Sequence, residues 1–261
     1  MGRRLGQHFL FDPGILDRIV DAIDPELEDV VIEVGPGKGT LTKRLAPRVG
    51  AVVAIERDVR LANDLEREHI SGVRVVAGDA LDFDWPLAVP KEKLKDHFKV
   101  VGNIPYKITT PLIEKALTPP LPVNIVFLLQ KEVGDRLQAA PGSSQYGGLT
   151  VGVNAVARVE RLFSVKAGSF SPPPRVDSVV VKIVPLDSPL VSLEDRPDFR
   201  RFVTQVFSKR RKQMERCLRS ALDISREEAG EILQKADVDP GVRPEVLLPQ
   251  DFVRLFRSLP R

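Results

Sequence analysis

The sequence contains few of the residues that mark secreted, metal-binding or membrane proteins. Its 261 residues include one cysteine, Cys217, which excludes an internal disulfide and a cysteine-rich zinc site. The three histidines lie far apart in sequence, so we expect no metal cluster. No apolar run approaches transmembrane length, and the basic N-terminus lacks the apolar stretch of a signal peptide. These absences predict a soluble, cytoplasmic protein without a membrane partner, and we expect it to act as a monomer.

The residues that are present indicate a globular chain. Hydrophobic residues make up 43% of the sequence and charged residues 29%, which leaves no room for a long disordered tract. The net charge of +3 at pH 7 is only weak evidence for nucleic-acid binding. The length suits one large domain with a small appendage.

Short apolar runs alternate with helix-like segments over most of the chain. Strands are expected at 30–34, 51–56, 73–80, 98–106, 123–129, 159–165 and 178–184. This alternation predicts an α/β fold with a doubly wound, mostly parallel sheet, in which ligands bind outside the carboxyl ends of the strands. After about residue 189 the pattern is helical only, and helices are expected at 197–222, 225–236 and 249–258. The sequence therefore predicts two domains, 1–188 and 189–261, of which the second is small and all-helical.

A glycine-rich turn follows the first strand, in the segment Glu33-Val-Gly35-Pro36-Gly37-Lys38-Gly39. Glycines at this point let a ligand approach the backbone at the N-terminus of the next helix. A dinucleotide site has the spacing G-x-G-x-x-G, whereas this turn has G-x-G-x-G with an acid two residues before it. We therefore expect Gly35 and Gly37 to bind a nucleoside cofactor that lacks a pyrophosphate, such as S-adenosylmethionine. Glu33 either orders the turn or holds water near the cofactor amine.

Two acids at neighbouring strand ends complete the expected cofactor site. Glu56 ends the second strand and is spaced to accept hydrogen bonds from ribose hydroxyls. Asp79 follows the third strand, where its carboxylate can accept a hydrogen bond from the exocyclic amine of an adenine. An aspartate in this position is also common as a solvated or capping turn residue. The convergence of both acids with the glycine turn favours the cofactor role.

The end of the fourth strand carries Asn103-Ile104-Pro105-Tyr106, which predicts chemistry on an aromatic amine. Such an amine is a poor nucleophile because its lone pair is delocalised into the ring. The Asn103 side-chain oxygen and a nearby backbone carbonyl can accept both amine hydrogens, which directs the lone pair at the methyl sulfonium. Pro105 stiffens the turn, and Tyr106 offers a ring on which a flipped base can stack. Catalysis is then by positioning and hydrogen bonding, with no covalent enzyme intermediate.

A dense basic segment lies between Arg200 and Arg219, with Glu215 as its one acid. Such a segment is typical of a surface that binds phosphates, and the alternative is a solvated helix face. Phosphate contacts are expected from four consecutive residues: Lys209, Arg210, Arg211 and Lys212. Trp85, His69 and His97 are expected to be packing or surface groups.

The motifs together resemble the ribosomal RNA adenine dimethyltransferase family, and more closely its small-subunit branch. The resemblance covers nearly the whole chain, through LGQHFL (5–10), EVGPGKGTLT (33–42), IERD (55–58), GDAL (78–81), GNIPYKITTPL (102–112), FSPPPRVDSVVV (170–181), FSKRRKQ (207–213) and LPQDFVRL (248–255). It implies a Rossmann-like class I methyltransferase that uses S-adenosylmethionine. The implied reaction is dimethylation of N6 on two adjacent adenines, in a loop of the 3′-terminal hairpin of small-subunit ribosomal RNA. The implied partner is that RNA within an assembling ribosomal particle.

The resemblance also implies which residues form the site. It places the cofactor against His8, Leu10, Gly35, Glu56, Asp79 and Asn103. It further implies that Phe170 stacks on the target base opposite Tyr106. The family often has asparagine where this chain has His8, so a partly buried structural histidine is the alternative at that position.

Three other functions share part of this pattern. The large-subunit methyltransferases that confer macrolide resistance share GxGxG and NIPY, but FSKRRKQ and FSPPPRVDS favour the small-subunit branch. A nicotinamide oxidoreductase is disfavoured by the glycine spacing and by NIPY. A non-catalytic RNA-binding assembly or transcription factor is disfavoured by the intact GPGKG, Glu56, Asp79 and NIPY.

Overall fold

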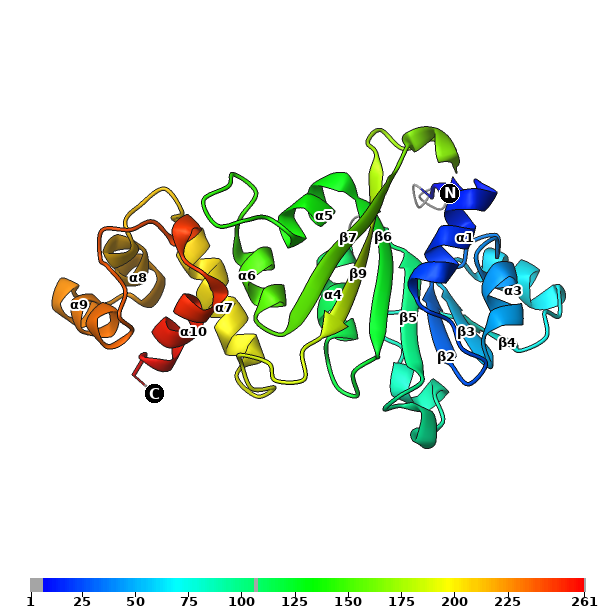
Figure 1. Cartoon of the computed structure of the whole chain (residues 1–261), viewed down its shortest axis with the longest axis horizontal. Helices are drawn as coiled ribbons and strands as arrows, with labels where there is room; N and C mark the ends of the chain where they lie inside the picture. The colour runs from blue at the N-terminus through cyan, green and yellow to red at the C-terminus, as the bar shows by residue number, and fades with distance from the viewer. Residues whose placement is uncertain (1–6, 106–107, 261) are drawn as a thin grey trace. The chain divides into compact units, whose positions relative to one another are not determined.

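The computed structural model describes residues 7–105 and 108–260, and the chain divides into two compact units (Figure 1). The first unit comprises the residues up to Gly134 together with Val159–Pro185, and the second comprises Asp135–Arg158 and Leu186–Arg261.

The strands are β1 (Phe9–Leu10), β2 (Val30–Val34), β3 (Ala51–Glu56), β4 (Val73–Ala77), β5 (Phe98–Asn103), β6 (Asn124–Gln130), β7 (Ala157–Val165), β8 (Phe170–Ser171) and β9 (Ser178–Pro185). The α-helices are α1 (Pro13–Ala22), α2 (Thr42–Leu45), α3 (Val59–Arg67), α4 (Thr109–Ala116), α5 (Lys131–Leu137), α6 (Gly148–Asn154), α7 (Arg196–Phe207), α8 (Met214–Leu222), α9 (Arg226–Lys235) and α10 (Pro249–Arg257). Short 3-10 helices are η1 (Ala46–Arg48), η2 (Trp85–Ala88), η3 (Lys91–Lys93), η5 (Ala167–Ser169) and η6 (Pro244–Val246).

The largest sheet has the strand order β4-β3-β2-β5-β6-β9-β7. Its pairs β2–β3, β2–β5, β3–β4 and β5–β6 are parallel, and β9 pairs antiparallel with β6. The predicted mostly parallel sheet is therefore confirmed. The chain leaves β4 at one edge and returns as β5 beside β2, so the direction of winding reverses between β2 and β5. In open sheets of this kind, ligands bind at the carboxyl ends of the strands on either side of that reversal.

The central strands are buried on both faces, as their near-continuous apolar runs predict. Every residue of β2 is buried. On one face Val31 joins a core cluster with Leu16 and Val20 of α1 and Leu45 of α2. Helix α1 lies over the sheet on this face in Figure 1. The packing of α1 fixes the chain that leads from the N-terminal segment into β2.

Two helix starts are fixed by their capping groups. Asp12 accepts a hydrogen bond from the Ile15 backbone N–H (3.1 Å), and Pro13 occupies the first turn of α1. Ser225 and Glu228 form a reciprocal capping box at the start of α9.

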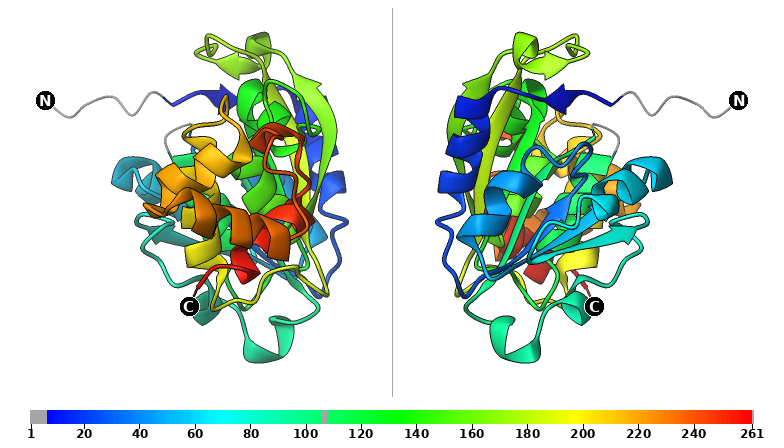
Figure 2. Two further views of the ribbon diagram at one scale, coloured as in Figure 1. Left: turned by 90° about the vertical axis from the view of Figure 1, so that its left-hand side faces the viewer. Right: turned by 90° about the vertical axis from the view of Figure 1, so that its right-hand side faces the viewer.

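The second unit is mainly helical, and α7 to α10 pack against one another within it (yellow to red in Figure 2). Cys217 is buried in α8 as a small packing residue, and burial raises the pKa of its thiol to about 11. Across the described residues, no helix is both long and apolar enough to cross a membrane.

The expected continuous helix at 197–222 is wrong, because the structure divides it into α7 and α8. Helix α7 ends at Phe207 and α8 begins at Met214. The backbone N–H of Met214 donates to the Val242 carbonyl (2.7 Å), and that of Glu215 donates to the Pro240 carbonyl (3.2 Å). These donors are therefore satisfied by a distant loop instead of by the preceding helical turn. The four basic residues 209–212 consequently lie on the connection between two helices.

Candidate active site

The glycine turn after β2 has a backbone that favours glycine. Gly35, Gly37 and Gly39 have φ values of +70°, +58° and +70°, which side chains rarely tolerate. A Cβ added at Gly39 would lie 2.5 Å from Cδ1 of Leu65, and one added at Gly37 would lie 3.0 Å from the Phe9 ring. The sequence thus specifies glycine both for conformation and for space.

Glu56, at the end of β3, holds the glycine turn in place. Its side chain is buried, with Oε2 accepting the Gly37 backbone N–H (2.9 Å) and Oε1 accepting the Asp58 backbone N–H (2.9 Å). Hydrogen bonds from backbone amides to a carboxylate are charge-assisted and strong. Sequence reasoning predicted contacts to ribose hydroxyls and missed this bond to Gly37, since 19 residues separate the two. A carboxylate oxygen can accept more than one hydrogen bond, so the predicted contact is compatible with the observed ones.

Asp79 lies in the turn after β4, next to the end of β3. Its Oδ1 accepts the Leu81 backbone N–H (3.0 Å), and its Oδ2 lies 3.4 Å from Nη1 of Arg57. The Gly78 backbone N–H donates to the Glu56 carbonyl (2.9 Å), which joins the two strand ends. Asp79 therefore has the turn-capping role that was the alternative interpretation. Its contact with a cofactor adenine stays a prediction.

Asn103 ends β5 at the point where the strand order reverses. Its Nδ2 donates to the His8 carbonyl (3.0 Å), so Oδ1 is the atom of this side chain that can accept a hydrogen bond. A Cβ on Gly35 would lie 3.5 Å from the Asn103 carbonyl oxygen, so the glycine turn and Asn103 adjoin. The Pro105 carbonyl accepts the Ile108 backbone N–H (3.1 Å) and thereby leads the chain into α4. Tyr106, predicted to stack on the base, lies outside the described residues.

The N-terminal segment is attached beside this site by a two-residue ladder and side-chain hydrogen bonds. Strand β1 pairs antiparallel with β8, and Leu10 lies opposite Phe170. The His8 ring donates from Nδ1 to the Pro172 carbonyl (2.8 Å). The Thr40 hydroxyl donates to the Leu10 carbonyl (3.1 Å), a bond that no sequence pattern indicated. His8 and Leu10 are thus brought next to Asn103 and the glycine turn.

Phe170 is buried in the core cluster together with Leu10, with 3% of its surface exposed. Stacking on a base requires one face of its ring to become uncovered. Its role in stacking on the target base stays a prediction.

Glu33 precedes the glycine turn and is 1% exposed. Burial raises the pKa of its carboxyl from 4.5 to about 7, the nearby Thr42 hydroxyl lowers it, and the charge of Glu56 raises it further. Among the described residues, Oε2 of Glu33 has no hydrogen-bond partner. Glu33 is therefore a buried carboxyl that holds its proton more tightly than a free one, and the two roles expected for it, ordering the turn or holding water near the cofactor amine, stay predictions.

The basic residues 209–212 belong to the second unit, and they differ in their surroundings. Lys209, Arg211 and Lys212 are exposed. Arg210 instead bonds through Nε and Nη2 to Oε2 of Glu245 (3.2 and 3.0 Å) and through Nη1 to the Ser144 carbonyl (2.8 Å). Arg210 thus has a structural role within its unit, which leaves its three neighbours as the better candidates for phosphate contacts.

The chain is similar to known proteins over almost its whole length. Residues 2–259 match the family described as "Ribosomal RNA adenine dimethylase". Over 261 residues, 98% of this chain and 94% of the relative, the sequence is 42% identical to ribosomal RNA small subunit methyltransferase A of Geobacter metallireducens. Among solved structures, a dimethyladenosine transferase from Plasmodium falciparum is similar with a TM-score of 0.82 and 30% identity, over 95% of this chain and 96% of the other. The 23S rRNA methyltransferase ErmE is similar with a TM-score of 0.70 and 26% identity, over 96% and 99%.

The sheet order and these structural neighbours define a Rossmann-like methyltransferase. Within that class, the match over almost the entire chain identifies one family. The chain belongs to the ribosomal RNA adenine dimethylase family, which confirms the resemblance found in the sequence. The roles of individual side chains in the site remain predictions.

Proposed function

We propose that the chain transfers methyl groups from S-adenosylmethionine to N6 of two adjacent adenines in small-subunit ribosomal RNA. The product is N6,N6-dimethyladenosine in a loop of the 3′-terminal hairpin, made during assembly of the subunit in the cytoplasm. The observation that supports this most directly is the position of Asn103. It ends β5 beside the glycine turn, and its Nδ2 is held by the His8 carbonyl.

This arrangement suits the chemistry of an aromatic amine. With Nδ2 engaged, Oδ1 of Asn103 can accept one N6 hydrogen, while a backbone carbonyl of the Ile104–Pro105 turn accepts the other. Both bonds draw the lone pair out of the ring system, and a positioned lone pair is most of what the reaction needs. Bound against Gly35, Glu56 and Asp79, the cofactor supplies an electrophilic methyl group. Each transfer would form an N6–carbon bond as the sulfur–methyl bond breaks, with S-adenosylhomocysteine as the leaving group and one N6 proton released to solvent.

Recognition of the RNA is assigned to the second unit. An adenine whose N6 is paired cannot enter the site, so the enzyme needs a loop nucleotide or a splayed one. The site residues do not distinguish the nucleotides on either side of the target adenine, so selectivity must come from the shape of the RNA. The exposed Lys209, Arg211 and Lys212 can contact phosphates held in a fixed arrangement, as in an assembling particle.

Loss of the Glu56 carboxylate is expected to weaken cofactor binding by at least about tenfold. Each charge-assisted hydrogen bond that it makes is worth roughly 1.5–3 kcal/mol. Calorimetry with S-adenosylmethionine would measure this in Glu56→Ala, and in Glu56→Gln, which keeps one acceptor oxygen for Gly37. Glu66→Ala, which removes an exposed acid of α3, is the matched control. Wild-type affinity in a folded Glu56→Ala protein would remove Glu56 from the cofactor site.

Replacing Lys209 and Lys212 together by alanine is expected to weaken the binding of RNA whatever its nucleotide sequence. The slope of log affinity against log salt concentration should become shallower by roughly 0.7–0.9 for each phosphate that is no longer neutralised. Filter binding of small-subunit RNA over a range of salt concentrations measures the slope. The control is the double variant Lys91→Ala and Lys95→Ala, which removes the same charge from exposed positions of the first unit. Equal slopes for both double variants would show that Lys209 and Lys212 are solvated and do not contact phosphates.

The substrate is identified by giving the enzyme labelled cofactor together with one of three substrates in parallel reactions. These substrates are immature small ribosomal subunits, large ribosomal subunits and free ribosomal RNA. Label is expected mainly in the small subunits, at adjacent adenines that mapping then identifies as N6,N6-dimethyladenosine. The similarity to a 23S rRNA methyltransferase makes large-subunit RNA the second candidate. Label found mainly in large-subunit RNA would establish that second candidate instead.

A further inference from the structure

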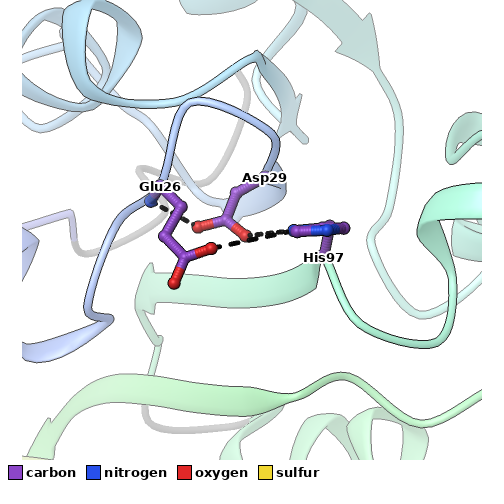
Figure 3. A group of neighbouring side chains, drawn as sticks. All are labelled: Glu26, Asp29 and His97. Carbon is purple, nitrogen blue, oxygen red and sulfur yellow. Dashed lines mark hydrogen bonds and ion pairs between the residues drawn. The ribbon is translucent and has the colours of Figure 1, made fainter.

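We propose that Glu26, Asp29 and His97 form a binding site for a divalent metal ion of the zinc class. Figure 3 shows the three side chains facing one another. Asp29 directly precedes β2 and His97 directly precedes β5, so the site lies at the amino ends of two paired strands. The candidate active site lies at the carboxyl ends of the same strands, about 20 Å away at 3.3 Å per residue. The ion would therefore have a structural role.

The backbone around these residues is fixed. The Val30 backbone N–H donates to the His97 carbonyl (2.8 Å), which joins the starts of the two strands. The Glu26 backbone N–H donates to Oδ2 of Asp29 (2.7 Å), and the Asp29 backbone N–H donates to the Glu26 carbonyl (3.0 Å). The turn that carries both carboxylates is therefore ordered before any ion binds.

Two buried atoms face each other in this cluster without a hydrogen bond. Asp29 is 0% exposed, and its Oδ1 has no hydrogen-bond partner among the described residues. Nδ1 of His97 is likewise buried without one, and lies 3.5 Å from Oδ1 of Asp29. A hydrogen bond would bring these atoms to roughly 2.7–3.2 Å. Two ligands about 2.1 Å from a tetrahedral ion stand roughly 3.4 Å apart, which matches the observed spacing.

Glu26 supplies the third ligand. Its Oε2 lies 4.0 Å from Nδ1 of His97, and its side chain is 63% exposed, so it can move the short distance that coordination requires. All three ligand atoms lie within 4.8 Å of one another. Solvent can occupy a fourth position on the exposed side. One nitrogen with two carboxylate oxygens favours zinc, cobalt or nickel over magnesium or calcium, which prefer oxygen ligands alone.

The charged groups around the cluster leave one negative charge that a cation can balance. The Lys99 ammonium lies 2.7 Å from Oδ2 of Asp29 and also donates to the Asp24 carbonyl (2.6 Å). It therefore binds the carboxylate oxygen that faces away from His97 and balances one of the two negative charges. The charge of Glu26 remains for the ion.

The test is calorimetric titration of Zn²⁺ into the untagged full-length chain after treatment with EDTA. One ion is expected to bind with a dissociation constant of roughly 10 µM or tighter. His97→Asn and Glu26→Gln are each expected to weaken binding at least tenfold. His69→Asn, at an exposed histidine elsewhere in the first unit, is the matched control and should bind as the wild type does. Zn²⁺ at about a hundredfold above its dissociation constant should raise the melting temperature by roughly 5 °C.

Spectroscopy with Co²⁺ provides an independent measurement. Visible absorption typical of a four-coordinate ion is expected in the wild type and in His69→Asn, and not in His97→Asn. Glu26→Gln changes an exposed side chain, so the comparison does not depend on how His97→Asn folds. The proposal is overturned if the wild type binds no Zn²⁺, if both cluster variants bind it as tightly as the wild type, or if Mg²⁺ is preferred.

Discussion

Alanine in place of Asn103 is expected to slow single-turnover methyl transfer by roughly 10²–10³-fold. Losses of this size follow when one hydrogen bond directed at a transition state is removed. The rate is measured at saturating cofactor with pre-bound small-subunit RNA, so that a change in binding does not enter the result. RNA affinity should stay near the wild-type value, because the proposed hydrogen bond from N6 to Asn103 acts on the transition state of methyl transfer.

Asn63→Ala is the matched control for this experiment, since Asn63 is an exposed asparagine of α3 in the same unit. Asn103 also holds the His8 carbonyl, so the affinity for S-adenosylmethionine should be measured alongside the rate. A lower cofactor affinity with an unchanged saturated rate would show that Asn103 acts only by ordering the N-terminal segment. A wild-type rate and affinity would remove it from the site altogether.

Glutamine in place of Glu33 is expected to make the protein more stable at pH 8 by up to about 3 kcal/mol. The pKa of Glu33 is raised from 4.5 to about 7, so the folded chain binds more protons than the unfolded chain between these values. The contribution of Glu33 to stability is therefore fully present below about pH 4.5 and is lost as pH rises through 7. A shift of this size corresponds to roughly 3 kcal/mol. Glutamine keeps the shape and carries no charge at any pH.

Urea unfolding of the wild type and of Glu33→Gln from pH 5 to pH 8 measures this effect as a difference. The free energy of unfolding of the variant should exceed that of the wild type by an amount that grows steadily as the pH rises. At pH 5 the difference should be small. Glu28→Gln, at an exposed acid near the start of β2, should show no such trend. A constant difference between Glu33→Gln and the wild type across the range would contradict the raised pKa.

The sequence was sufficient to predict features whose cause is local. The apolar run 30–34, interrupted only by Glu33, is typical of a parallel strand buried on both faces, and it became β2. The glycines at 35, 37 and 39 were recognised because positive φ restricts the choice of residue. The sequence placed NIPY at the carboxyl end of a strand expected at 98–106, and β5 ends at Asn103.

Features that depend on distant partners could not be predicted. The break between α7 and α8 arises from the bond between Met214 and Val242, while the residues between the two helices are ordinary helix formers. Strands β1 and β8 are two residues long, too short for any periodic pattern. Asp29 and His97 are unremarkable in sequence and meet only because β2 and β5 pair.

The division of the chain into two units separates the residues proposed to catalyse methyl transfer from the residues proposed to recognise the RNA. The residues assigned to the cofactor and the amine come from the first unit, whereas Lys209 to Lys212 belong to the second. With the function proposed above, mutations on the helical unit are expected to alter which RNA is selected and to leave the reacting groups untouched.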